Sequence, residues 1–193
     1  MAKKPLVLPH DPAWADEGLD WADQVRDALG ALALDIDHVG STAVSGLAAK
    51  DALDIQALVF DLDEAGPVIA ALVAAGFRHR PDKRGAAPKA GYPDHADCWD
   101  EMFFREPHGA RAVHLHIREA GTAAARVALL LRDFLRADDM ARAQYDALKR
   151  GLAVHVKDER AYADLKRPFV AVTLRMAEAW AERTRWRPGQ SDA

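Results

Sequence analysis

The chain has 193 residues, which is typical of one compact domain, and its content of 50% hydrophobic and 29% charged residues is that of a soluble globular protein. Its net charge of −4 argues against a dedicated nucleic-acid binder, because such proteins usually carry a basic excess. The single cysteine, Cys98, excludes an intrachain disulfide, and the longest uncharged apolar run, AALVAAGF, is too short to span a membrane, so we expect a cytoplasmic protein.

The N-terminal part predicts a helix and then a short strand. Apolar residues recur every three or four positions over residues 13–33, as in an amphipathic helix, and Asp11-Pro12 is a typical helix start. Residues 34–39 alternate along the chain as a short strand does, and a Gly-Ser-Thr turn at residues 40–42 follows.

The next predicted strand, residues 53–59, carries polar residues on one face. Its odd-numbered positions are apolar, from Leu53 to Val59, and predict a buried face. Asp54 and Gln56 therefore lie on the opposite face. A helix is predicted over residues 63–75, and Gly76 ends it.

The middle of the chain predicts a long loop followed by a hairpin. Residues 78–97 are rich in Pro, Gly and basic residues without a clear period, and a loop of this length is more often functional or mobile than regular. Residues 99–105 and 112–117 predict two strands of a hairpin, in which His114 and His116 share a face of the second strand.

The last third predicts three amphipathic helices, the second starting after Asp138 and the third after Asp158. Pro168 should kink or restart the third helix, because its ring removes a backbone donor. We interpret Lys149 and the basic residues near it as a solvated face, because they alternate with acidic residues.

These elements together predict an α+β fold with one mixed β-sheet flanked by helices. We expect a single domain over residues 1–193. It would comprise a mixed-sheet core at 1–119, C-terminal helices at 120–186 and a loose tail at 187–193.

The turn at residues 40–42 has two interpretations. Gly40 lets the backbone approach a phosphate, and the Ser41 hydroxyl can bind its oxygens, all the more so if a helix begins near Thr42. The same residues also suit a tight turn with a Ser/Thr cap and no ligand.

Asp54 is a candidate ligand for a divalent metal ion. A carboxylate near the start of a strand offers the hard oxygen that Mg²⁺ prefers, although two-metal sites usually need two or three carboxylates. Gln56 is neutral where a second acid would be expected, and Asp51 could compensate only in part. The alternative is that Asp54 is a solvated residue on the polar face of the sheet.

His114 and His116 are spaced for a transition metal, with a third ligand from Asp54 or Glu101. The alternative is a pair of histidines that bond their neighbours on a half-buried sheet. Five basic residues could line a phosphate site or be ordinary surface charges: Lys50, Arg105, Arg111, Arg118 and Arg132.

The stretch HVGSTAVSGLAAKDALDI, residues 38–55, resembles the signature of the GrpB family. The resemblance continues in VHLHI, LLRDFLR, AQYDALKRGLA and DERAYADLKRPFV, and so covers most of the chain. It also extends to the C-terminal extension of some actinobacterial dephospho-coenzyme A kinases. Ser45 and Asp51 stand where the family usually has proline.

The resemblance implies a nucleotidyltransferase-like fold, because the family is assigned to the nucleotidyltransferase superfamily. In that superfamily a Gly-Ser turn binds nucleotide phosphates and carboxylates on the next strand bind divalent metal. Carried over by position, this implies Gly40, Ser41 and Thr42 as phosphate contacts and Asp54 as a ligand of Mg²⁺ or Mn²⁺. Lys50, His114 and His116 match the family pattern without settled roles.

Three functional hypotheses remain open. The first is a metal-dependent nucleotidyltransferase, in which Asp54 holds the metal and Lys50 neutralises charge on the leaving pyrophosphate. The second is a non-catalytic binder of a nucleotide or phosphorylated small molecule, which Gln56 favours. The third is a transition-metal site at His114 and His116. The acceptor of the first hypothesis is open between a metabolite, a protein hydroxyl and an RNA end.

Overall fold

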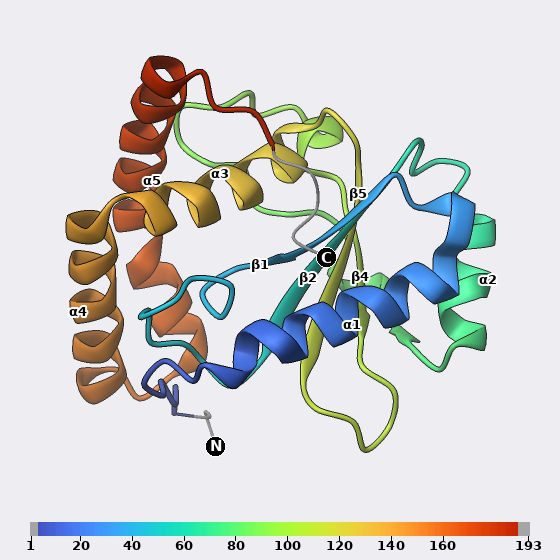
Figure 1. Ribbon diagram of the computed structural model, residues 1–193, viewed down its shortest axis with the longest axis horizontal. Helices are drawn as coiled ribbons and strands as arrows, with labels where there is room; N and C mark the ends of the chain where they lie inside the picture. The colour runs from blue at the N-terminus through green and yellow to red at the C-terminus, as the bar shows by residue number, and fades with distance from the viewer. Residues whose placement is uncertain (1–3, 189–193) are drawn as a thin grey trace.

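The computed structural model describes residues 4–188 and shows a five-stranded mixed β-sheet with helices on both faces (Figure 1). Helices α1 and α2 cover one face, and α3, α4 and α5 gather over the other, at the left of Figure 1. The α-helices are α1 (Ala13–Leu29), α2 (Gly66–Ala74), α3 (Ala123–Ala137), α4 (Asp139–His155) and α5 (Glu159–Thr184). The strands are β1 (Asp35–Val39), β2 (Leu53–Val59), β3 (Arg78–His79), β4 (Met102–Arg105) and β5 (Val113–Glu119).

The sheet has the order β1-β2-β5-β4-β3, and β2 and β5 form its parallel pair. All the other neighbours are antiparallel, including the predicted hairpin of β4 and β5. In the parallel register Asp54 lies opposite His114, and Gln56 lies opposite His116. The polar residues of two strands that are far apart in the chain therefore meet on one face.

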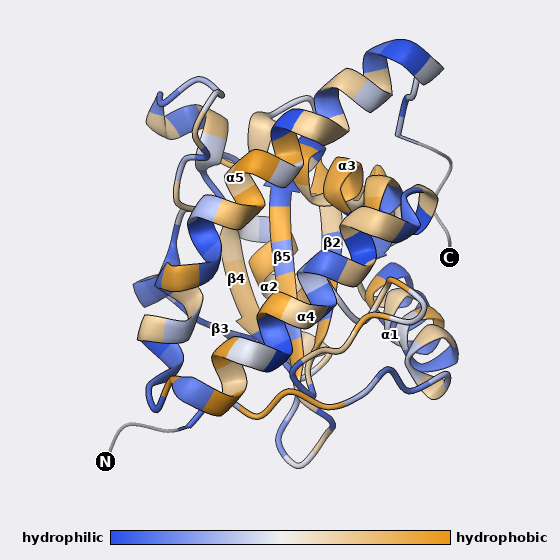
Figure 2. Ribbon diagram, turned by 90° about the vertical axis from the view of Figure 1, so that its left-hand side faces the viewer, coloured by the Kyte–Doolittle hydropathy of each residue, from blue (hydrophilic) through white to orange (hydrophobic). Residues whose placement is uncertain are grey.

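The two faces of the sheet differ in chemistry because side chains alternate along each strand. The apolar face, with residues such as Leu53, Ile55, Leu115 and Ile117, is buried against α1 and α2 and forms the main hydrophobic core. Figure 2 shows the alternation along β5, with α3, α4 and α5 on its polar side. The polar face, which carries Asp54, therefore looks toward the C-terminal helices.

Each of the three C-terminal helices begins at a side-chain cap. Thr122 accepts a hydrogen bond from the Ala125 N–H, Asp138 from that of Ala141, and Asp158 from that of Ala161. Such caps satisfy backbone donors that have no partner inside the helix. The helix starts predicted after Asp138 and Asp158 are confirmed.

Some predicted elements differ in their limits. The first helix ends at Leu29 and continues as a 3₁₀ turn, Gly30–Leu32. The segment 78–97 is less irregular than predicted, because β3 pairs with β4 and 3₁₀ turns form at Pro81–Lys83 and Ala96–Trp99.

Pro168 was predicted to kink or restart the third helix. A restart is wrong, because α5 runs through Pro168 as one helix of 26 residues. The packing of buried residues on both sides of the proline, Tyr162 and Leu174, offsets the lost hydrogen bond.

From residue 189 on, the predicted loose tail lies outside the described residues. Within residues 4–188, no helix has both the length and the apolar character needed to cross a lipid bilayer.

Candidate functional site

Two adjoining cavities open on the polar face of the sheet. The first, of about 230 Å³, is called the lysine lobe and is lined by Lys50, Lys149 and Lys166 together with Thr42, Ala49, Ala52, His114 and Tyr162. The second, of about 270 Å³, is called the arginine lobe and is lined by Arg118 and Arg132 together with Val39, Gly40, His116, Ala128, Leu131, Leu135 and Tyr145. Ser41, Asp54 and Lys166 line both lobes. The serine and the aspartate thus face a common cleft.

A larger cavity, of about 930 Å³, lies away from this cleft, between residues 90–98 and α5. Two of its charged side chains are paired with each other, because Arg126 Nη2 lies 2.6 Å from Glu178 Oε2, and Tyr92 donates to Glu178 Oε1 at 2.7 Å. We therefore place the candidate site at the smaller, more basic pair of lobes.

Gly40 and Asp54 approach each other closely. Gly40 has φ of +74°, and a Cβ atom at this position would lie 2.3 Å from Asp54 Oδ2. Only glycine both adopts this backbone conformation at low cost and leaves room for the carboxylate. The turn is thereby held against the metal-ligand candidate.

No α-helix begins at Thr42 or Ala43, so a helix dipole does not assist this turn. The Thr42 hydroxyl lies 2.8 Å from His38 Nε2, a nearly buried group that faces α1. Thr42 also lines the lysine lobe, so this contact fixes one wall of the cavity.

Asp54 is surrounded by donors. His114 Nδ1 donates to Asp54 Oδ1 at 2.9 Å, and His116 Nε2 lies 3.9 Å from the same oxygen. Burial alone would raise the pKa of Asp54, but the two histidines outweigh it and hold that pKa well below its usual range. Asp54 is therefore an ionised carboxylate at neutral pH.

His116 is held between two carboxylates. Its Nδ1 donates to Glu101 Oε2 at 3.2 Å. Burial and Arg118 act to lower its pKa, yet the bonds to Asp54 and Glu101 prevail and raise it. Burial would raise the pKa of Glu101, but His116 and Arg118 lower it to about 2.

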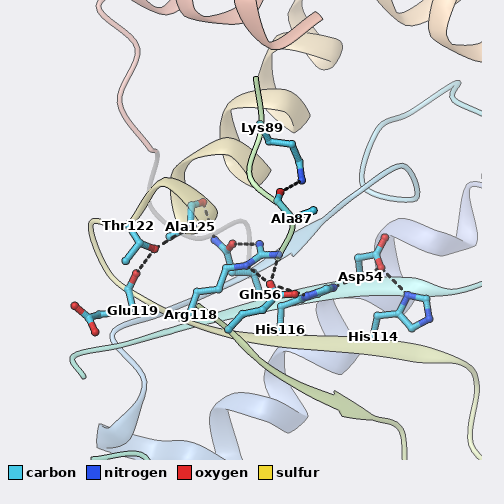
Figure 3. A network of polar contacts seen from close by, with 11 residues as sticks. Asp54, Gln56, Ala87, Lys89, His114, His116, Arg118, Glu119, Thr122 and Ala125 are labelled. Carbon is cyan, nitrogen blue, oxygen red and sulfur yellow. Dashed lines mark hydrogen bonds and ion pairs between the residues drawn. The ribbon is translucent and has the colours of Figure 1, made fainter. Parts of the chain in front are cut away.

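Gln56 is fully buried and bonded, and is therefore not a metal ligand (Figure 3). Its Oε1 accepts from Arg118 Nη1 at 2.6 Å, and its Nε2 donates to the Ala125 carbonyl at 3.4 Å. Arg118 in turn donates from Nε to Glu101 at 2.7 Å. A guanidinium thus occupies the neighbourhood in which a second metal-binding acid was expected.

Some of the other charged candidates line the two lobes, and the rest pair with residues elsewhere. Lys50, Arg118 and Arg132 line the lobes. Arg111 instead pairs with Glu17 and with Asp51, at 2.7 and 2.8 Å, and Arg105 pairs with Glu106. Asp51 lines neither lobe, so it does not replace the missing second acid.

The interpretation of Lys149 as part of a solvated face is wrong. Its side chain is 2% exposed and lies at the wall of the lysine lobe, with its Nζ 5.2 Å from the centre of the Tyr145 ring. Tyr162, which is 1% exposed, lines the same lobe. Among residues 4–188, neither the Lys149 Nζ nor the Tyr162 hydroxyl has a hydrogen-bond partner.

Burial and the nearby charge of Lys166 lower the pKa of Lys149 to about 7. The pKa of Lys166 is also lowered, by burial and by Lys50. Three lysines therefore crowd into one small lobe, and a bound anion would relieve their repulsion. The sequence contains one signal for the burial of Lys149, because this residue follows Tyr145 and Leu148 along the apolar stripe of its helix.

The donor set fits a metal only in part. Among the described residues, no group of three or more His, Cys, Asp or Glu side chains is arranged to hold a metal ion. His114 and His116 share a face as predicted but bond to Asp54 and Glu101, so the transition-metal hypothesis gains no support. Asp54 alone suits Mg²⁺ or Mn²⁺ that arrives with substrate phosphates, since Mg²⁺ is commonly held by one or two carboxylates plus phosphate oxygens.

Relatives of the chain are found among both sequences and structures. A family model described as GrpB protein matches residues 4–175. A dephospho-CoA kinase of Mycolicibacterium paratuberculosis is 33% identical over 202 residues, covering 97% of this chain and 50% of the kinase. The chain therefore spans about half the length of that relative.

Two solved structures share the architecture. The conserved protein GrpB from Enterococcus faecalis matches with a TM-score of 0.72 and 22% identity, over 91% of this chain and 99% of that chain. Cid1 in complex with its short product ApU matches with a TM-score of 0.51 and 17% identity, over 76% of this chain and 42% of that chain. At these identities the likeness shows the fold alone, and it confirms the α+β, nucleotidyltransferase-like mixed sheet.

Proposed function

The chain belongs to the GrpB family, and from this family and the chemistry of the cleft we propose that it binds a nucleoside triphosphate, with the phosphates in the lysine lobe. The observation that carries the proposal is the pair of buried, unpartnered polar groups at the wall of that lobe. The Lys149 Nζ and the Tyr162 hydroxyl find no partner among residues 4–188. Leaving a buried donor unpaired is costly, so a ligand oxygen is its natural complement.

The charge of the lysine lobe supports an anionic ligand. Lys50, Lys149 and Lys166 line it, and among residues 4–188 Asp54 is the one residue with a carboxylate in its lining. Lysine ammonium groups act as point charges toward phosphate oxygens, and the Ser41 hydroxyl at the lobe's border adds a donor. A phosphate chain seated here would satisfy both unpartnered groups.

Calorimetric titration of the full chain with each of the four ribonucleoside triphosphates tests this proposal. Dephospho-CoA belongs in the same panel of ligands, because it carries a phosphate chain and because a relative of this chain is a dephospho-CoA kinase. We expect a dissociation constant in the micromolar range, roughly −8 kcal/mol, for at least one triphosphate. Binding should change little when a chelator replaces Mg²⁺, because the lysines supply the charge.

Substitutions in the lobe make the test specific. Lys149→Met should weaken triphosphate binding by at least tenfold, and Tyr162→Phe by a smaller factor. Lys157→Met is the matched control, since Lys157 is an exposed lysine that follows the same helix. Absence of binding by all ligands at millimolar concentration, or equal affinity of Lys149→Met and the control, would refute the proposal.

A second candidate function is metal-assisted nucleotidyl transfer, and the position of Asp54 favours it. The Asp54 carboxylate borders both lobes, so it lies where a phosphate in one lobe would meet a group in the other. Asp54 would hold the Mg²⁺ or Mn²⁺ that accompanies the phosphates, and such an ion would neutralise charge on phosphate oxygens. Lys50 would stabilise the charge of the departing pyrophosphate.

Nucleotide turnover separates the two candidates. With γ-labelled triphosphates and Mg²⁺ or Mn²⁺, transfer predicts metal-dependent release of labelled pyrophosphate. This release should be lost in Asp54→Asn while the fold is kept. If a nucleotide binds but none of the four is turned over, the protein is a nucleotide binder and the transferase is excluded.

A further inference from the structure

The arginine lobe has a different composition from the lysine lobe. One wall is apolar and consists of Val39, Leu131 and Leu135. The positive charge comes from Arg118 and Arg132, together with Lys166, which this lobe shares with the lysine lobe. Among residues 4–188, Asp54 is the one acidic residue that lines it. The carboxylate partners of the two arginines, Glu101, Asp37 and Asp133, lie outside the cavity lining. An apolar wall opposite fixed guanidinium groups suits a small molecule that has a short carbon skeleton and an anionic group.

Arg118 is held rigidly in a binding geometry. Its Nε and Nη2 both lie 2.7 Å from Glu101 Oε2, and its Nη1 donates to Gln56 at 2.6 Å. A guanidinium has five N–H donors, so these three contacts leave two for a ligand. Little side-chain entropy remains to be lost, since the side chain is 8% exposed and already anchored.

The two lobes lie on either side of Asp54 along the strands. Ala52 and His114 border the lysine lobe, whereas His116 and Arg118, further along β5, border the arginine lobe. A phosphorus atom near Ser41 and Asp54 would therefore have one lobe on each side. In-line phosphoryl chemistry requires the leaving group and the incoming group on opposite sides of phosphorus.

We propose that the arginine lobe is the subsite of a second, small ligand whose carboxylate or phosphate group pairs with Arg118. This proposal rests on the proposed function, because it requires the lysine lobe to hold the triphosphate. The ligand is a small metabolite and not a polynucleotide end, because the lobe measures about 270 Å³ and the chain carries a net charge of −4. The inference names the class of acceptor that the cleft would take.

Two minimal anions test the proposal on the full chain saturated with inorganic triphosphate. Malonate represents the carboxylate group and orthophosphate represents the phosphate group. Titration calorimetry measures a second binding equivalent, and the Arg118 Nε–H resonance in nitrogen-15 NMR spectra reports its location. We expect one further anion to bind and to shift that resonance, and the better probe identifies the anionic group.

Three variants change the arginine lobe at residues that do not line the lysine lobe. Ala128→Trp fills the arginine lobe, and Ala128→Leu does so with less risk to folding, because Ala128 lines this lobe and not the other. Arg118→Lys keeps the positive charge and removes the planar set of N–H donors that a guanidinium offers to an anion. Each should weaken the second anion at least tenfold and leave triphosphate affinity within twofold. Ala137→Trp, at an exposed position of the same helix, is the control and should change neither.

The outcomes are distinguishable. The proposal is overturned if no second equivalent appears, if the anions only displace triphosphate, or if the second equivalent is unaffected by both Ala128 variants and Arg118→Lys. If neither inorganic triphosphate nor any of the four nucleoside triphosphates binds, the proposed function fails. The same titrations without triphosphate then decide whether an anion binds in a manner sensitive to Arg118→Lys and insensitive to Lys149→Met.

Discussion

Gly40 shows how one residue can be determined by another that is distant in the sequence but adjacent to it in the fold. Its backbone conformation disfavours a side chain, and the Asp54 carboxylate occupies the space that a Cβ atom would need. The sequence motif predicted a turn with a close backbone approach at this position. It identified a phosphate as the approaching group, whereas the structure places Asp54 Oδ2 there.

Gly40→Ala should destabilise the protein by about 1–3 kcal/mol through backbone strain and the clash with Asp54. Gly109→Ala is a suitable control, because Gly109 has φ of +80° but no atom within 4 Å of the added Cβ. Urea unfolding should therefore show a larger loss for Gly40→Ala than for Gly109→Ala. Equal losses would mean that the carboxylate moves away at no cost.

Lys149 reduces the stability of the folded chain, because a buried ammonium that has no hydrogen-bond partner among residues 4–188 loses its hydration. Lys149→Met, which preserves the volume of the side chain, should raise the free energy of unfolding by about 1–3 kcal/mol at pH 7. The same variant weakens ligand binding, so stability and function would move in opposite directions.

The pH dependence of this gain follows from the pKa of Lys149, which falls from 10.5 to about 7 on folding. Between these values the unfolded chain binds more protons, so the stability of the unchanged protein rises with pH. The cost of Lys149 is fully present below pH 7 and fades toward pH 10.5. Lys166, Tyr162, Asp146, Arg150 and Asp54 also face or influence this group, and remain in both proteins. The advantage of Lys149→Met in denaturant titrations should therefore shrink from pH 7 to pH 10.

At the scale of elements, α4 is tied to the loop that follows the Gly-Ser turn. Asp146 Oδ1 on α4 accepts a hydrogen bond at 2.6 Å from the backbone N–H of Ala48, a residue with no exposed surface. The helix that supplies Lys149 is thereby fixed relative to the turn that supplies Ser41. This contact spans 98 residues of the chain.

Asp146→Ala should cost about 1–3 kcal/mol, because it leaves the buried Ala48 N–H without its acceptor. It should also weaken triphosphate binding, since α4 and the turn would no longer be held together. Asp139→Ala on the same helix is the comparison, as the Asp139 side chain is 88% exposed and its ion pair is with the nearby Arg142. Thermal unfolding and calorimetry of the two variants would contradict this role of Asp146 if they gave the same result.

The elements were largely predictable because local patterns determine them. Period-two alternation identified β2 and β5, and aspartate caps identified the starts of α4 and α5. The continuation of α5 through Pro168 was not predictable, since it depends on packing against other elements. The parallel pairing of β2 with β5 likewise depends on tertiary structure and not on any local signal.

At the scale of the whole molecule, the candidate site is divided between the sheet and the C-terminal helices. The family resemblance predicted that Ser41 and Asp54 share a site, and sequence reasoning left the partner of the two histidines open between Asp54 and Glu101. It missed Lys149, Tyr162 and Lys166, which reach the cleft from α4 and α5. The orientation of helices over a sheet depends on the complete core, so periodicity alone does not assign these residues to a cleft.

A ligand that joins the two parts should protect both from hydrogen exchange. At a triphosphate concentration of about 100 times the dissociation constant, linkage predicts about 2.7 kcal/mol of added stability. Slower exchange is expected at residues 40–50 and in α4 and α5 together, whereas α2, on the far face, should respond only through global unfolding. Protection confined to the turn would mean that the lysines of the helices do not contact the ligand.

The pairing of β2 with β5 also has a consequence for the way the chain reaches its native state. Asp54 and His114 are separated by 60 residues, and the intervening chain must close into a large loop before they meet. Pairing of distant parallel strands is slow, whereas helices with local contacts form quickly. During refolding, recovery of anion binding should therefore lag behind recovery of helical signal, because the cleft assembles only after this loop has closed.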